Sequence, residues 1–166
     1  MTDERADLWR ALRRLPRGAG VVFRHHATPP KERRRLWRRL RREALARGLV
    51  LVRGGVEPLP GEMGVHKGAR GGGLRTRPVH DVAEARAARR LGNDVVFVSP
   101  VFATRSHPGA KALGVRRAAG LARIAGCAAV ALGGVDARRA RGLPRAFVGW
   151  AGVDAWGGGP GTARQG

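Results

Sequence analysis

The sequence has few of the residues that mark secreted, membrane-spanning or base-stacking proteins. It has one cysteine, Cys127, so no disulfide can form within the chain, which favours a cytoplasmic location. No apolar run approaches the roughly 20 residues that a membrane-spanning helix needs, and we expect no signal peptide. Tyrosine is absent and phenylalanine occurs four times, which leaves few rings for nucleic-acid bases to stack on.

Acidic residues are also scarce, because 12 Asp and Glu stand against 33 Lys and Arg, a formal net charge of +21. Many of the arginines fall in a predicted amphipathic helix that Pro29-Pro30 opens and that runs to about Arg47. Its apolar side carries Leu36, Leu40 and Leu45. The arginines predicted on its solvent side are Arg33, Arg34, Arg35, Arg38, Arg39, Arg41 and Arg42. We attribute the charge to solvated helix faces and a GC-rich coding sequence, ahead of a dedicated RNA site.

Short apolar runs alternate with helical patterns along most of the chain. The runs begin near Val21, Leu49, Gly64, Pro78, Val95, Ala128 and Ala146. Several are continuous, as in strands buried on both faces of a parallel sheet, and the helices between them imply right-handed βα units. Seven strands are one short of a closed eight-stranded barrel. We therefore expect an α/β fold of the triosephosphate isomerase barrel type, with one domain over residues 1–156 and a disordered glycine-rich tail over 157–166.

Each of the five histidines lies at or just after the C-terminal end of a predicted strand. They are His25, His26, His66, His80 and His107. A single histidine at such a place is more often structural than catalytic. All five nevertheless fall at the edge where α/β barrels keep their chemistry, so we regard this edge as the candidate site.

Six residues in three loops predict a site for a small anion. They are Thr104, Ser106 and His107 after the fifth predicted strand, Gly133 and Gly134 after the sixth, and Gly152 after the seventh. The first three offer hydroxyl and imidazole groups. The glycine N–H groups can approach a phosphate because no Cβ stands in the way. The combination is typical of the phosphate site that follows the last strands of a barrel.

Five motifs, in the same order, resemble the thiamine phosphate synthase and thiazole tautomerase family. They are Val22-Phe-Arg-His-His26, Gly64-Val-His-Lys-Gly68, Pro78-Val-His80, Ser99-Pro-Val-Phe-Ala-Thr-Arg-Ser-His107 and Ala131-Leu-Gly-Gly-Val135. The resemblance covers residues 21 to 152 and implies a barrel enzyme that joins aminopyrimidine diphosphate to thiazole phosphate. In that family the diphosphate leaves with the help of magnesium, and the thiazole nitrogen captures the pyrimidine cation.

The resemblance also implies roles for the candidate residues. Gly133, Gly134 and Gly152 would hold the thiazole phosphate, Thr104, Ser106 and His107 would line the same side, and Arg24 and His26 would face the diphosphate. His80 would move a proton, as in the tautomerase relatives. The expected partners are therefore the two phosphorylated substrates, without a membrane or nucleic acid, while a homo-oligomer stays open.

The chain also departs from the family pattern. The family's metal-binding carboxylates align with Val52-Arg53 and Ala69-Arg-Gly71, so we expect no magnesium ligands here although the family uses magnesium. Arg53 and Arg70 could replace the metal as anion clamps, but we favour loss of the diphosphate half-site. The family's first strand and last helix have no counterpart, which we ascribe at the N-terminus to a start codon assigned too late.

These departures leave three functions open. The first is the joining reaction of thiamine phosphate synthase, carried out by a divergent member of the family. The second is thiazole tautomerase activity with His80 as the proton shuttle. The third is a non-catalytic role, in which the arginine-rich helices bind an anion or RNA.

Overall fold

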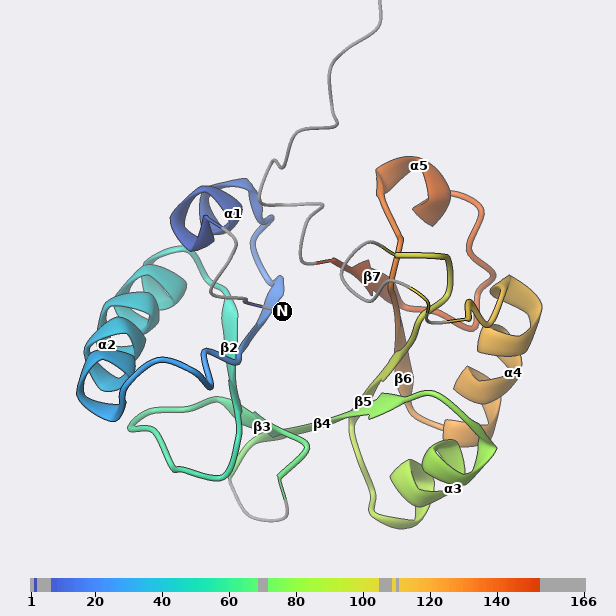
Figure 1. Ribbon diagram of the computed structural model, residues 1–166, viewed down its shortest axis with the longest axis horizontal. Coiled ribbons are helices and arrows are strands. Elements are labelled where there is room, and N and C mark those ends of the chain that lie inside the picture. Colours follow the sequence, from blue (N-terminus) through green and yellow to red (C-terminus); the bar gives the residue numbers. More distant parts are fainter. Residues whose placement is uncertain (1, 3–6, 69–71, 105–108, 110, 153–166) are drawn as a thin grey trace, which may run out of the picture. The chain divides into compact units, whose positions relative to one another are not determined.

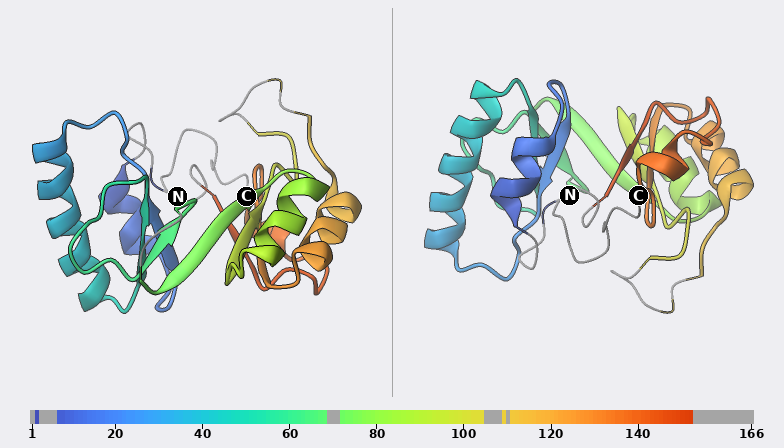
Figure 2. Two further views of the ribbon diagram at one scale, coloured as in Figure 1. Left: turned by 90° about the horizontal axis from the view of Figure 1, so that it is seen from below. Right: turned by 90° about the horizontal axis from the view of Figure 1, so that it is seen from above.

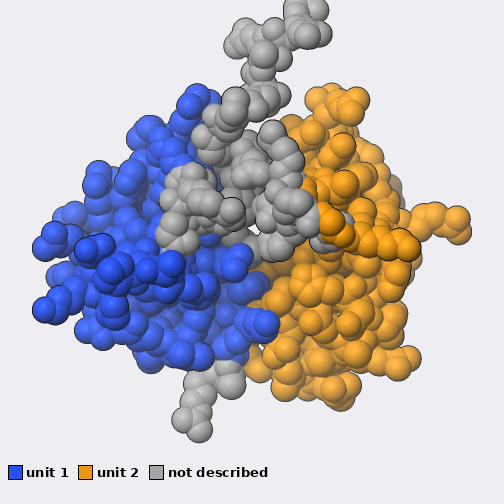
Figure 3. Space-filling view, viewed as in Figure 1, with its two compact units in different colours: residues 1–73, 153–166 blue, residues 74–152 orange. Residues whose placement is uncertain are grey.

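A computed structural model of the chain describes residues 2, 7–68, 72–104, 109 and 111–152. The chain forms two compact units, which are residues 1–73 with 153–166 and residues 74–152 (Figure 3). We call them unit 1 and unit 2. The single domain expected over 1–156 stays a prediction, and the glycine-rich tail 157–166 lies outside the described residues.

Unit 1 contains two helices and three parallel strands. In chain order these are α1 (Leu8–Arg14), β1 (Gly20–Phe23), α2 (Pro30–Ala46), β2 (Val50–Gly54) and β3 (Gly64–His66). β1 pairs with β2 and β2 pairs with β3. Both helices lie on the same side of these strands (Figures 1 and 2). Their buried apolar residues join those of β1 and β2 in one core.

Helix α2 is held by a stripe of buried residues at helical spacing. Pro30 suits the first turn because its missing N–H would have no partner there. Trp37, Leu40 and Ala44 are fully buried, and the Trp37 indole N–H donates to the Pro60 carbonyl oxygen at 3.0 Å. Because these three side chains face the core, the opposite face of α2 is exposed to solvent.

Two residues of α2, Arg33 and Leu45, differ from the prediction in whether they face the core or the solvent. Arg33 is only 6% exposed, although it was predicted on the solvent side, because its guanidinium donates to carbonyl oxygens at the ends of β1 and β2. Leu45 is 50% exposed rather than buried, because Ala44 occupies the core position beside it.

Unit 2 repeats the βα pattern with four parallel strands. Its elements are β4 (Leu74–Val79), α3 (Val82–Arg90), β5 (Val95–Val98), α4 (Val115–Ala125), β6 (Ala128–Leu132), α5 (Ala137–Ala140) and β7 (Gly149–Ala151). Each strand pairs with the next one along the chain. Helices α3 and α4 cover one side of the strands (Figure 1), with small side chains such as Ala85, Ala118 and Ala122 in the core.

The last strand begins three residues later than predicted. The apolar run Ala146 to Val148 was interpreted as the strand, but the strand is Gly149–Ala151. Phe147 is a buried anchor whose N–H donates to the Pro144 carbonyl oxygen in a turn, and Val148 is 72% exposed. The run therefore leads into the strand, while the strand itself contains a glycine that carries no apolar signal.

Seven strands are found among the described residues, as predicted. None of the helices within the described ranges is both long and apolar enough to span a bilayer.

Candidate functional site

The register of unit 2 brings several predicted site residues to one edge of its strands. Val79 pairs with Val98, so His80 and Ser99 both come directly after this pair. Leu132 pairs with Ala151 in the same way, so Gly133 and Gly152 follow that pair. Because Val98 also pairs with Ala131, His80 is level with Leu132, and the two glycines lie one residue beyond that level at the same edge.

His80 is fixed at both its ring and its backbone. Its ring Nδ1 lies 2.7 Å from the Ser99 carbonyl oxygen, and because a carbonyl can only accept, Nδ1 must carry the proton. In the neutral ring, Nε2 then has a lone pair that can accept a proton. The His80 backbone N–H donates to Glu84, whose own N–H is bound by the Asp81 side chain at the start of α3.

Ser99 is the contact of His80 that the sequence analysis missed. Besides its carbonyl, its hydroxyl Oγ lies 3.3 Å from the same Nδ1. Ser99 is 8% exposed and directly follows β5, the strand next to β4. Its position after the neighbouring strand is the signal that could have suggested this pairing.

The loop after β5 packs against the glycine turn after β6. The N–H groups of Val101 and Phe102 donate to the carbonyl oxygens of Leu132 and Gly133 at 2.9 and 3.0 Å. A Cβ on Gly134 would lie 2.3 Å from the Ala103 carbonyl oxygen, and its φ of +61° is a conformation that favours glycine. The two segments therefore lie side by side, and the glycines are required for this close approach.

The remaining residues of the predicted anion site are only partly described. Thr104 is half-buried and directly follows Ala103, the residue of the loop that approaches the glycine turn. Ser106 and His107 lie outside the described residues. Gly152 is half-buried and directly follows β7.

Arg139 supplies a cation at the glycine turn, and the sequence analysis did not single it out. Its guanidinium donates to the Gly134 carbonyl oxygen and lies over the Phe102 ring, 5.0 Å from the ring centre. The Asp136 carboxylate caps α5 by accepting the Arg139 backbone N–H, and this hydrogen bond lowers the pKa of Asp136. Because the Asp136 carboxylate already occupies the N-terminus of this short helix, the positive charge at the turn comes from Arg139.

The carboxyl ends of the unit 1 strands carry Arg24, Gly54 and His66. Phe23 pairs with Arg53, and Gly54 pairs with His66, so Arg24 lies at the height of the latter pair. The Arg24 N–H donates to the Thr2 hydroxyl oxygen at 3.0 Å, and that hydroxyl also bonds with His25. The His26 ring lies close to Gly55, because a Cβ there would be 3.2 Å from the ring carbon Cε1. Thus Arg24 and His26 belong to the strand edge where they were predicted.

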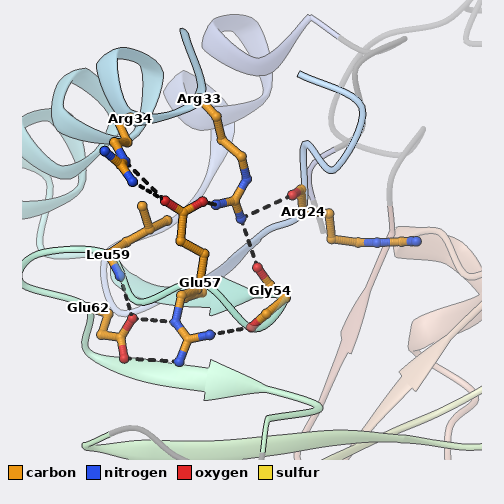
Figure 4. Close-up of polar contacts among 9 residues, drawn as sticks. Arg24, Arg33, Arg34, Gly54, Glu57, Leu59 and Glu62 are labelled. Carbon is orange, nitrogen blue, oxygen red and sulfur yellow. Dashed lines mark hydrogen bonds and ion pairs between the residues drawn. The ribbon is translucent and has the colours of Figure 1, made fainter. Parts of the chain in front are cut away.

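Two buried arginines hold this edge together (Figure 4). Arg33 donates to the Gly54 carbonyl oxygen at 2.8 Å and to the Arg24 carbonyl oxygen at 3.4 Å. Arg53 is 1% exposed and donates to both carboxylate oxygens of Glu62 and to the Gly55 carbonyl oxygen. Since Arg53 already binds its own carboxylate, the suggestion that it clamps an anion in place of the metal is not supported.

The described residues do not fit a magnesium site. They contain no group of three or more His, Cys, Asp or Glu side chains that could hold a metal ion. At the end of β2 the carboxylate of Glu62 is bound by Arg53. Arg70, the other suggested clamp, lies outside the described residues. We therefore derive no chemical step that depends on a metal.

The lowered pKa of His66 predicts that the stability of the fold depends on pH. Burial lowers its pKa from 6.5 to about 4, and the positive charge of Arg24 adds to this lowering. The unfolded chain thus binds a proton at a higher pH than the folded chain does. We predict that the melting temperature falls as the pH decreases from about 6.5 to about 4. Thermal unfolding of the protein and of His66→Gln across this range tests it, because the variant should show a shallower dependence; identical curves would contradict it.

Comparison with known proteins agrees with the resemblance read from the motifs. Residues 76–154 match the family model described as thiamine monophosphate synthase. The resemblance to the thiamine phosphate synthase family is confirmed. The matched residues include His80, Gly133 and Gly134, but not Arg24 or His26. The family match therefore covers the residues expected to bind the thiazole phosphate and not those expected to bind the diphosphate. No curated protein matches the chain.

A solved structure has a similar fold. The chain is similar to thiamine phosphate pyrophosphorylase from Pyrococcus furiosus, with a TM-score of 0.76 and 18% sequence identity. The match covers 96% of this chain and 86% of that chain. The α/β fold of the triosephosphate isomerase barrel type is thus confirmed.

Proposed function

We propose that this chain is a divergent member of the thiamine phosphate synthase family that acts in thiamine biosynthesis, in the cytoplasm, and binds a phosphorylated thiazole with unit 2. The observation that supports this most is the close packing of the loop after β5 against the glycine turn after β6, within the matched residues 76–154. Arg139 adds a positive charge at this turn. The phosphate would lie against Gly133, Gly134 and Arg139, with Thr104 nearby.

The first candidate reaction joins aminopyrimidine diphosphate to thiazole phosphate. The bond between the pyrimidine methylene carbon and the diphosphate oxygen breaks, and a bond between that carbon and the thiazole nitrogen forms. The family match favours this reaction. Arg24 and His26 would bind the diphosphate, as the resemblance to the family implies.

The second candidate is tautomerisation of the thiazole precursor, and the geometry of His80 favours it. A proton leaves one atom of the substrate for the Nε2 of His80 and returns at another atom, so no other bond needs to break. The Ser99 carbonyl fixes the tautomer of His80 in which Nε2 can accept. An exposed histidine with one fixed nitrogen suits this exchange.

We predict that His80→Ala lowers the rate of tautomerisation by about 10²- to 10⁴-fold, the usual contribution of a positioned acid or base. Ser99→Ala is the matched control, because it removes the hydroxyl but keeps the carbonyl that bonds Nδ1. Its rate should stay close to that of the unchanged protein. Equal rates for His80→Ala and the unchanged protein would remove His80 from the mechanism.

Two assays on the purified protein test the proposed function. Incubation with both substrates, with magnesium and with a chelator, measures thiamine phosphate; incubation with the thiazole tautomer alone measures isomerisation. Product in the first assay supports the joining reaction, and product only in the second supports the tautomerase. If neither product exceeds the blank and phosphorylated thiazole does not bind, the proposal is wrong.

A further inference from the structure

The solvent face of α2 carries a cluster of arginines around a depression in the surface of unit 1. The residues that line it are Arg35, Arg38, Arg39, Arg41, Arg42 and Pro60. We call this the α2 arginine surface. Since all of its arginines belong to one helix, unit 1 alone determines their arrangement.

The helical spacing places three of these arginines in one row. Arg35, Arg38 and Arg42 are separated by three and four residues, so they share one face of α2 and span about 10 Å along its axis. The opposite face contains Trp37 and Leu40, which are fully buried. The core of unit 1 therefore holds the row in a fixed orientation toward solvent.

Glu32 and Glu43 are the carboxylates of α2, two against the five arginines of this surface. Among the described residues, no ion pair is recorded for any of its five arginines, and the pairs of unit 1 involve Arg33, Arg34 and Arg53. Like charges three or four residues apart on a helix repel each other, so the row is unfavourable without an anionic partner. The Arg39 guanidinium lies over the Trp9 ring, 4.1 Å from its centre, and this contact restricts its orientation.

We propose that the α2 arginine surface binds the phosphodiester backbone of a nucleic acid. Guanidinium groups bind phosphate oxygens through paired N–H groups, and a row of them on a rigid helix suits a row of phosphates. A membrane surface fits less well, because a helix that binds in the lipid interface needs a free apolar face, and that face of α2 is buried against unit 1. Contacts of this kind are independent of base sequence.

The test measures the affinity of the full chain for labelled mixed-sequence RNA single strands and DNA duplexes at several salt concentrations. The variant Arg35→Gln/Arg38→Gln/Arg42→Gln removes the row. The control Arg86→Gln/Arg89→Gln/Arg90→Gln removes three exposed arginines from α3, with the same change in net charge. Glutamine is nearly as good a helix former as arginine, and thermal unfolding verifies that both variants are folded.

We expect the α2 variant to lose at least about tenfold in affinity at 0.1 M salt, and its salt dependence to fall by about 2 to 3 in log–log slope. The α3 control should change both quantities much less. Equal losses in the two variants, no binding by the unchanged protein, or tighter binding to anionic phosphatidylserine vesicles than to either nucleic acid would overturn the proposal. The enzymatic assays use other residues, so their failure would be a separate result.

Discussion

Glu62→Gln is expected to destabilise the folded protein by about 3 to 5 kcal/mol, the usual effect of leaving one partner of a buried ion pair without the other. Arg53 is 1% exposed, and both oxygens of the Glu62 carboxylate accept from its guanidinium. The same carboxylate accepts the Leu59 backbone N–H at 3.1 Å. The amide of glutamine would keep one acceptor but remove the negative charge that binds the buried Arg53 guanidinium through both of its oxygens.

Glu57→Gln is the matched control for this prediction, because Glu57 also pairs with arginine in unit 1 but at the surface. The side chains of Glu57 and its nearer partner Arg34 are 37% and 62% exposed. The buried Arg33 lies farther from the Glu57 carboxylate, at 3.9 Å, and its guanidinium also donates to the Gly54 carbonyl oxygen. Water and salt replace such a contact at little cost, so the control should stay close to the unchanged protein. Denaturant unfolding followed by tryptophan fluorescence measures the free energies; equal values for the two variants would contradict the prediction. The double variant Arg53→Met/Glu62→Met should recover much of the loss, since it leaves no buried charge.

The sequence pattern predicts the strands better than the roles of the arginines. The apolar runs give the strands because buried parallel strands are continuous in apolar residues. Arg33 is different, because it shares the helical stripe of Trp37, Leu40 and Ala44. The spacing places Arg33 on the buried face, yet its charge suggests solvent. The carbonyl oxygens that compensate this burial come from other segments of the chain, so α2 alone does not predict them.

The candidate site could likewise be predicted in part. The motifs indicate His80, Gly133 and Gly134, because these residues directly follow strands. Ser99 and Arg139 were missed, since their contacts depend on which strands are neighbours and on how a short helix is oriented. Such contacts depend on the pairing register, and the sequence of a single strand does not determine that register. A catalytic role for these residues stays a prediction.

Gly134→Ala is expected to destabilise the protein by about 2 to 4 kcal/mol. Part of the cost comes from its φ of +61°, which an L side chain adopts unfavourably. The rest comes from packing, because the added Cβ would lie 2.3 Å from the Ala103 carbonyl oxygen and 2.9 Å from the Phe102 Cβ. Neither group is the end of a flexible side chain, so the loop after β5 has to move.

Gly126→Ala separates the two contributions. Gly126 follows α4 with a φ of +68°, but a Cβ there meets only the Arg89 side chain at 3.6 Å, an ordinary contact. Its cost should be about 1 kcal/mol, from the backbone conformation alone. Thermal unfolding compares the two variants. Equal destabilisation would contradict the prediction, because it would show that the loop after β5 moves without a loss of stability. On the proposed function, Gly134→Ala should also weaken binding of phosphorylated thiazole, whereas Gly126→Ala should not. The glycine turn would then have two roles, packing against the loop after β5 and binding the phosphate. Each role requires a close approach to the backbone that a Cβ would prevent.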